Sequence, residues 1–189
     1  MSTEAVKRFV ALLTLLADVI VIARVIILVM GRWPAGRRAL APLLVVLGPI
    51  RLPAAFAVAA TTMAGSLYFS EVAHFTPCKL CWFQRIGLYP VAIILAFALV
   101  MRDRSITRSA ILLAALTAPI SVYHYLIEWY PELEAGSCDP TAPCTAVWFR
   151  EFGFISLSFM AASSALAIIS LLTLPSPAPA ADPSDRISP

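Results

Sequence analysis

Two cysteines, Cys78 and Cys81, are three positions apart at the start of a strongly apolar segment, and Arg85 follows four positions later. The thiolate is the reactive form of cysteine, and the start of a helix lowers the pKa of a cysteine placed there. Thr76 as the N-cap and Pro77 at the first helical position would begin such a helix. Residues three and four apart share one helix face. The spacing therefore predicts a redox-active cysteine pair with Arg85 as its counter-charge.

The other two of the four cysteines, Cys138 and Cys144, enclose a short segment that contains two prolines. A disulfide across so short a loop removes little chain entropy, so it would be a poor structural staple. Exposed or strained disulfides tend to be the exchangeable ones. We expect an exposed bond that exchanges readily, although the residues alone leave the pairing of the four thiols open.

His124 is a further candidate for the site, with Glu128 four residues later in the same predicted helix. An imidazole can donate a hydrogen bond or carry a proton. The alternative is an interfacial histidine in an aromatic belt that includes Tyr123 and Trp129. Gln84 is a weaker candidate for lining the same pocket.

The composition identifies an integral membrane protein. Of 189 residues, 60% are hydrophobic and 13% are charged, and the mean hydropathy is +0.86. A typical soluble domain is about half apolar and about a quarter charged. The net charge of +3 is small and no basic face is visible, which excludes a nucleic-acid-binding surface.

Apolar runs of about 20 residues predict membrane-spanning helices. The segment 42–50 contains prolines and is either a kinked helical extension or a short surface-lying piece. We therefore predict an all-α membrane protein, with a four-helix bundle at 53–174 after an N-terminal extension at 1–52, and a disordered proline-rich tail at 175–189. The predicted helices cover 9–30, 53–69, 78–101, 109–128 and 154–174.

The loops predict which side each end of the helices faces. The segments 31–38 and 102–108 carry three arginines each, and short cytoplasmic loops are enriched in such residues. The segments 71–78 and 129–153 then face the outside together with all four cysteines. Because disulfides belong to oxidising compartments, the cysteine positions agree with the charge rule.

The sequence over 64–172 resembles the disulfide bond formation protein B (DsbB) family. The order of the cysteine pairs distinguishes it from the vitamin K epoxide reductase family, in which Cys-x-x-Cys follows the looser pair. The resemblance rests on the blocks GSLYFSE at 65–71, PCKLCWFQR at 77–85, YHY at 123–125 and FGFISL at 152–157.

The resemblance implies a four-helix bundle in the bacterial inner membrane that re-oxidises a soluble thioredoxin-fold thiol oxidase. A thiol of this partner would attack Cys138 of a Cys138–Cys144 disulfide. Freed Cys144 would then engage Cys78 and release Cys81 as a thiolate. The helix at 9–30 has no counterpart in the family, and its role is not implied.

The resemblance also implies a quinone, either ubiquinone or menaquinone, held near the outer surface. Arg85 would stabilise the thiolate and the charge that develops on the quinone, and His124 would lie close to the ring. Two alternatives remain at this point. The four thiolates could close a zinc site, or they could form two structural disulfides.

Overall fold

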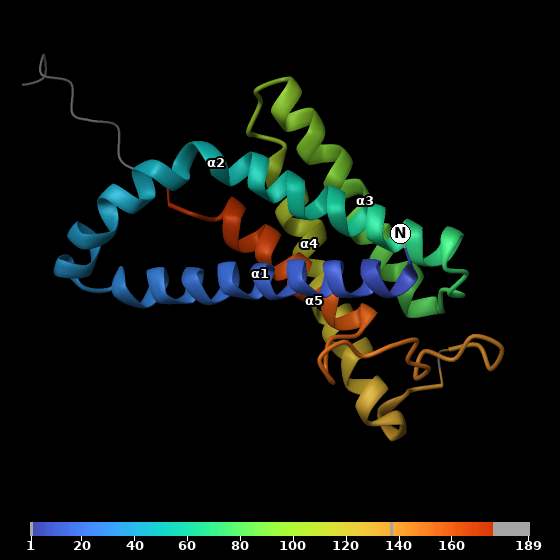
Figure 1. Ribbon diagram of the computed structural model, residues 1–189. Helices are drawn as coiled ribbons and strands as arrows, with labels where there is room; N and C mark the ends of the chain where they lie inside the picture. Colours follow the sequence, from blue (N-terminus) through green and yellow to red (C-terminus); the bar gives the residue numbers. More distant parts are fainter. Residues whose placement is uncertain (1, 137, 176–189) are drawn as a thin grey trace, which may run out of the picture.

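The computed structural model describes residues 2–136 and 138–175, so the predicted tail lies almost entirely outside the described residues. The all-α prediction is confirmed (Figure 1). A π-helix, η1 (Tyr68–Val72), follows α2, and a 3-10 turn, η2 (Pro131–Leu133), follows α4. The α-helices are α1 (Thr3–Met30), α2 (Pro34–Leu67), α3 (Lys79–Val100), α4 (Thr107–Trp129) and α5 (Leu157–Leu172).

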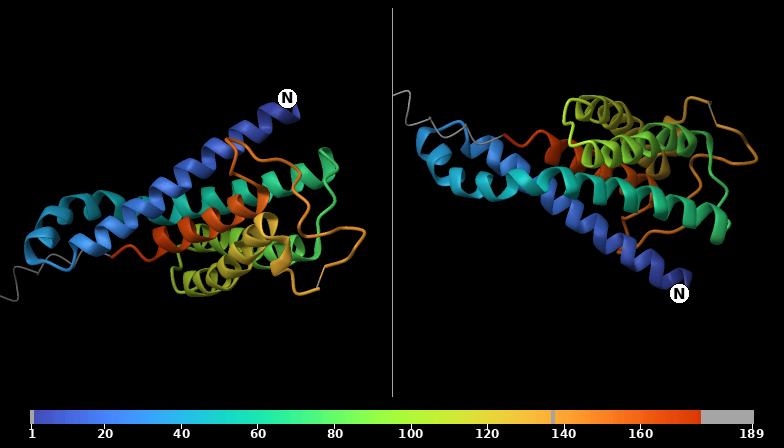
Figure 2. Two further views of the ribbon diagram at one scale, coloured as in Figure 1. Left: turned by 90° about the horizontal axis from the view of Figure 1, so that it is seen from below. Right: turned by 90° about the horizontal axis from the view of Figure 1, so that it is seen from above.

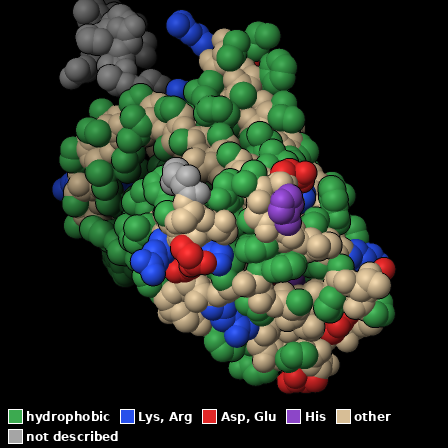
Figure 3. Space-filling view, turned by 45° about the vertical axis from the view of Figure 1, so that its right-hand side comes forward, with side chains coloured by type: hydrophobic (Ala, Val, Ile, Leu, Met, Phe, Trp, Pro, Cys, Tyr) green, Lys and Arg blue, Asp and Glu red, His purple; other side chains and the backbone are tan. Residues whose placement is uncertain are grey.

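Four helices among the described residues are long and apolar enough to cross a membrane: α1, α2 together with η1, α3, and α4. Hydrophobic side chains cover much of the visible face, and charged side chains form small groups between them (Figure 3). The additional N-terminal helix predicted over 9–30 is therefore present, and α1 packs against both α5 and α2.

Helix α5 is the most deeply buried helix, with 11 of its 16 residues buried. It packs against α1, α2 and α4 and measures about 24 Å at the usual helical rise. It begins three residues later than predicted. Ile155 pairs with Glu151 in the preceding turn, and Ser156 caps the helix by accepting a hydrogen bond from the Phe159 amide at 3.4 Å.

Two arginines bind the carbonyl groups at the C-terminal end of α5. Arg24 donates to the Thr173 oxygen at 2.9 Å, and Arg51 donates to the Leu174 oxygen at 2.7 Å. Positive charge is favourable at this end of a helix. Both arginines therefore connect the N-terminal helices α1 and α2 to the end of α5.

The segment 42–50 is a helical extension within α2 and not a separate surface-lying piece. Helix α2 runs without interruption through Pro42, Pro49 and Pro53. With η1 it forms a 39-residue helical stretch, much longer than the roughly 20 residues that span a bilayer. The end of α1 and the start of α2 accordingly form a hairpin that projects beyond the other helices (Figures 1 and 2).

The N-terminus lies at the same end of the bundle as the start of α3 and the long loop after α4 (Figure 2). The Lys7 ammonium group sits 5.8 Å from the Phe75 ring centre and 5.3 Å from that of Phe149. Cys78 and Cys144 belong to one buried cluster, with Cys81 and Cys138 packed against it. All four sulfurs therefore meet at one end of the bundle.

A close approach of α3 and α4 at Gly87 yields the first testable prediction. A Cβ atom at Gly87 would overlap the side chain of Thr117, whose hydroxyl donates to the Leu113 oxygen at 2.8 Å. Gly87→Ala should therefore destabilise the bundle by about 1–3 kcal/mol, as overpacking of a core does. Thermal unfolding in detergent would measure the loss.

Gly65→Ala is the matched control, because the nearest atom to a Cβ there is 3.8 Å away, in Val10. Equal unfolding midpoints for the two variants would contradict the close approach of α3 and α4.

Candidate redox site

Cys78 itself caps α3. Its sulfur accepts a hydrogen bond from the Cys81 amide at 3.4 Å, and its backbone is extended, with φ −75° and ψ 175°. The prediction that Thr76 is the cap was wrong by two residues, because the sulfur occupies the place of a capping oxygen. The consequence favours reactivity, since the Cys78 sulfur faces the positive end of the helix dipole.

The two sulfurs of this pair lie 3.1 Å apart as free thiols. The pKa of the Cys78 thiol is lowered from 9.0 to about 4. The main cause is the hydrogen bond from the Cys81 thiol, and the His124 ring adds a second, while burial opposes both. Cys78 therefore carries the thiolate in this reduced arrangement.

The lowered pKa of Cys78 predicts how the reduced protein responds to pH. Because the folded pKa lies below the ordinary thiol value of 9.0, the thiolate contributes its full stability to the reduced fold only above that pH, and the contribution declines progressively until it is lost as the pH falls through about 4. Ultraviolet thiolate absorbance should therefore persist from neutral pH down to about pH 5. His124→Leu should move its loss to higher pH, whereas His74→Leu, in the preceding loop, should not. Loss of absorbance near the ordinary thiol pKa in the unsubstituted protein would contradict this account.

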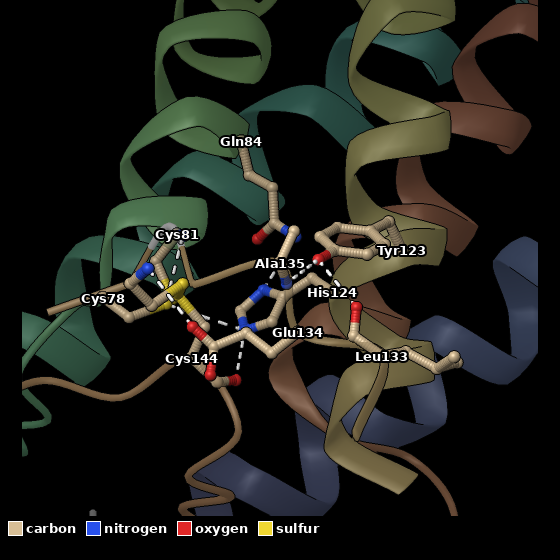
Figure 4. Close-up of a disulfide and its surroundings, with 10 residues drawn as sticks. Cys78, Cys81, Gln84, Tyr123, His124, Leu133, Glu134, Ala135 and Cys144 are labelled. Atoms are coloured by element: carbon tan, nitrogen blue, oxygen red, sulfur yellow. Dashed lines mark hydrogen bonds between the residues drawn. A yellow bond between two sulfur atoms is a disulfide. The ribbon is translucent and has the colours of Figure 1, made fainter. Parts of the chain in front are cut away.

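The second pair is a disulfide between Cys138 and Cys144. Cys138 is half-buried, whereas Cys144 is fully buried, so the expectation of an exposed bond was wrong for one of its two sulfurs. The loop folds back on α4, where the Tyr123 hydroxyl donates to the Leu133 oxygen at 3.2 Å (Figure 4). The Cys138 amide donates to the Glu134 carboxylate at 3.2 Å.

His124 bridges the two cysteine pairs. Its Nε2 lies 3.1 Å from the Cys144 carbonyl oxygen and 3.6 Å from the Cys78 sulfur. The Gln84 amide nitrogen lies 3.2 Å from Nδ1 and donates to it, which leaves the ring proton on Nε2. Figure 4 shows the ring directed toward Cys78 and Cys144, with Gln84 on its other side. One N–H group of the ring therefore serves both pairs.

Two cavities adjoin the cysteines. The first is largely apolar and lies among α1, α2, α3 and α5, and both Cys81 and Arg85 line it. The second lies under the long loop and is lined by Cys78, Cys81 and His124. Cys81 thus borders both cavities, whereas Arg85 borders only the first and His124 only the second. The structure places His124 between the cysteine pairs, and its closeness to a quinone ring stays a prediction.

Arg85 is held by Ser66 of α2. Its Nε donates to the Ser66 hydroxyl at 3.1 Å, and its Nη2 donates to the Ser66 carbonyl at 3.1 Å. The Tyr89 hydroxyl donates to the same Ser66 oxygen at 3.0 Å. Sequence reasoning did not single out Ser66, because its contact with Arg85 depends on how α2 packs against α3.

The π-helix η1 was also not foreseen. It begins two residues after Ser66, and the Ala73 amide donates to the Tyr68 oxygen at 3.0 Å in the five-residue pattern of a π-turn. Phe69 and Ser70 of this turn line the first cavity. Such turns often occur at functional sites, which agrees with its position beside Arg85.

Glu128 is a buried carboxylate on the second cavity, one turn beyond His124. One of its oxygens accepts from the Ser158 hydroxyl at 2.6 Å, and the other has no hydrogen-bond partner among the described residues. The sequence indicated only its spacing from His124.

The structure bears on the zinc alternative. Ligand atoms of Cys78, Cys81 and His124 lie within 4.8 Å of one another. The other two thiols are joined in the Cys138–Cys144 bond, so the four-thiolate site is not formed in this pairing.

The fold and the site define a helical membrane protein of the thiol–disulfide redox class. The family described as "Disulfide bond formation protein DsbB" matches residues 50–174. The chain belongs to this DsbB family, and the resemblance inferred from the cysteine blocks is confirmed. Family membership implies a redox enzyme of disulfide formation.

Curated relatives agree. The chain is 38% identical over 124 residues to "Disulfide bond formation protein C" of Bacillus subtilis, covering 65% of this chain and 90% of that protein. It is 37% identical over 111 residues to a "Probable disulfide formation protein" of Oceanobacillus iheyensis, covering 58% and 77%. A protein of the same description from Deinococcus radiodurans is 40% identical over 100 residues, covering 52% and 65%. No solved structure matches the chain.

Proposed function

We propose that this protein is a membrane thiol:quinone oxidoreductase of the bacterial cytoplasmic membrane, with its cysteines on the extracytoplasmic side. It re-oxidises a soluble thioredoxin-fold thiol oxidase and passes the electrons to ubiquinone or menaquinone. The observation that carries the proposal is the position of Cys81, which borders both the cavity beside the disulfide loop and the apolar cavity that contains Arg85.

The disulfide loop is suited to the first exchange. A partner thiolate attacks the half-buried Cys138 sulfur, forming a mixed disulfide and releasing Cys144 as a thiolate. Cys144 lies in the same buried cluster as Cys78, so it attacks the oxidised Cys78–Cys81 pair at Cys78 and releases Cys81. His124, which lies next to both Cys78 and the Cys144 carbonyl, orients the two groups.

The remaining exchanges return the outer pair to a disulfide. The second partner thiolate attacks the mixed disulfide and the partner leaves oxidised, which frees Cys138 as a thiolate. Cys138 then attacks Cys144 and releases Cys78. Two electrons now reside in the Cys78–Cys81 dithiol and the Cys138–Cys144 bond is restored, which is the pairing found in the structure.

The first cavity fits a quinone. A quinone ring is flat and apolar and carries two carbonyl oxygens that accept hydrogen bonds. The cavity offers apolar walls and the Arg85 N–H groups that Ser66 does not use. When bound, a quinone supplies the electron sink, taking up two electrons and two protons. Arg85 would hold a ring oxygen, and Cys81, one turn away on the same helix, would face the ring.

The test mixes purified oxidised protein with a reduced thioredoxin-fold thiol oxidase and a short-chain quinone in the absence of oxygen. The fall in quinone absorbance should correspond to one quinone molecule reduced for each partner disulfide formed during steady turnover. Partner oxidation that exceeds the disulfides carried by the protein itself and still consumes no quinone would overturn the proposal. Tightly bound zinc together with the absence of quinone reduction would instead support the metal-binding alternative.

A further inference from the structure

Helix α1 lies outside the residues matched by the family, yet it packs beside the apolar cavity. Val10 of α1 lines the cavity together with the α3 residues Cys81 and Arg85. The next residue, Ala11, is completely buried in a cluster with Ile155 and Met160 of the loop and α5. The first turns of α1 are therefore seated in the bundle and are not merely laid against its lipid-facing surface.

Helix α2 approaches α1 at Gly65, which also lines the cavity. A Cβ atom at Gly65 would be 3.8 Å from a methyl group of Val10, an ordinary van der Waals distance. Val10 therefore covers the seam between α2 and α5. Without it, this side of the cavity would open to the surrounding lipid.

Lys7, one turn before Val10, contacts an aromatic cluster made of Phe69, Phe75, Trp148 and Phe149. Its ammonium group lies 5.8 Å from the Phe75 ring centre and 5.3 Å from the Phe149 ring centre, and only 14% of its side chain is exposed. A cation over aromatic faces is attracted to them. Glu4 pairs with the same ammonium group at 2.7 Å and is itself 65% exposed.

The aromatic cluster is also a wall of the cavity. Phe75 stacks on Trp148 with ring centres 4.7 Å apart and planes within 5°, and it stacks on Phe69 at 5.7 Å. Phe69, Phe75 and Trp148 all line the cavity. Lys7 therefore lies against the aromatic cluster that forms this wall.

We propose that α1 forms part of the wall of the quinone site. Val10 contacts the bound quinone and closes the pocket on the side of α1, and Lys7 positions the aromatic wall. The inference rests on the proposed function, and it assigns a role to the helix that the family resemblance leaves unexplained. It predicts that a substitution in α1 changes quinone binding without changing thiol exchange at the four cysteines.

Val10→Phe tests the wall directly. Val19→Phe is the matched control, because Val19 is on the same helix and is 59% exposed on its outer face. Binding of a short-chain benzoquinone, measured by quenching of tryptophan fluorescence, should be at least about tenfold weaker for Val10→Phe and unchanged for Val19→Phe. A second readout uses no quinone: each oxidised protein should still oxidise the same number of reduced partner molecules.

Lys7→Met keeps the length of the side chain and removes its charge, so it tests the inference even if Val10→Phe does not fold. Binding should weaken about threefold, whereas Glu4→Gln, which leaves the ammonium over the rings, should have no effect.

The outcomes separate the two proposals. If the unsubstituted protein binds and reduces quinone while Val10→Phe and Lys7→Met bind it equally well, the role of α1 is wrong and the function stands. If the unsubstituted protein binds no quinone, the proposed function fails first. Equal weakening by Val10→Phe and Val19→Phe would also overturn the role, because the effect would not be confined to the cavity.

Discussion

Alanine at any one of the four cysteines is expected to lower quinone-linked turnover by at least about 10³-fold, because residues that act as one unit fail together. The four variants should nevertheless differ in a single round of reaction. With Cys78→Ala or Cys81→Ala, the Cys138–Cys144 bond remains, so each protein should oxidise one partner molecule and then stop. With Cys138→Ala or Cys144→Ala, a partner thiol meets no accessible disulfide and none should be oxidised. Rapid mixing followed by alkylation of the remaining thiols would count these equivalents.

The number of partner molecules oxidised in a single round also distinguishes disulfide exchange between the two cysteine pairs from purely structural disulfides. If the bonds only held the fold together, alanine variants would lose stability while the folded fraction kept its turnover. A single-round yield of one equivalent from Cys138→Ala would contradict the order of exchange, because it would mean that the partner attacks the inner pair directly. Buried Cys78 makes that direct attack unfavourable.

Arg85→Met is expected to weaken quinone binding by about ten- to a hundredfold, because a charge-assisted hydrogen bond contributes roughly 1.5–3 kcal/mol. The loss should appear as a raised KM for quinone, while the single-round oxidation of the partner stays normal. Arg85→Lys should fall in between, since an ammonium group keeps the charge but cannot bind Ser66 through the same two-pronged geometry. Turnover as a function of quinone concentration would give the KM of the unsubstituted protein, Arg85→Met and Arg85→Lys.

Arg104→Met is the matched control for Arg85→Met. Arg104 is exposed in the α3–α4 connection, away from the cavity that contains Arg85. If the Arg104 and Arg85 variants had the same KM for quinone, Arg85 would have no special place in the site. A normal KM with slow partner oxidation in Arg85→Met would place its role in thiol exchange instead.

The helices and the meeting of the cysteines at one end could be predicted from the sequence. Both depend on patterns within a segment: runs of apolar residues, clusters of arginine in loops and the Cys-x-x-Cys spacing. The helix ends were less predictable, because they depend on which atom caps the first turn. A cysteine sulfur capped α3, and Ser156 capped α5 after a turn that the apolar pattern had included in the helix.

The residues that complete the site could not be predicted, because their roles arise from contacts between helices. Ser66 meets Arg85 across the α2–α3 interface, and Val10 meets Gly65 across α1 and α2. His124 was identified as a candidate from its residue type and position, but its place between the two cysteine pairs depends on the path of the loop that carries Cys144. No periodicity within a segment contains that information.

Cys81 borders two cavities whose contents should not mix. Quinones add readily to thiols, so a soluble thiol protein that reached the ring would be modified and lost. In the proposed reaction the partner stops at the disulfide loop and the ring stays on the far side of Cys81. The partner and the quinone exchange electrons only through disulfide exchange among the four cysteines. The quinone therefore contacts no thiol other than those of this protein.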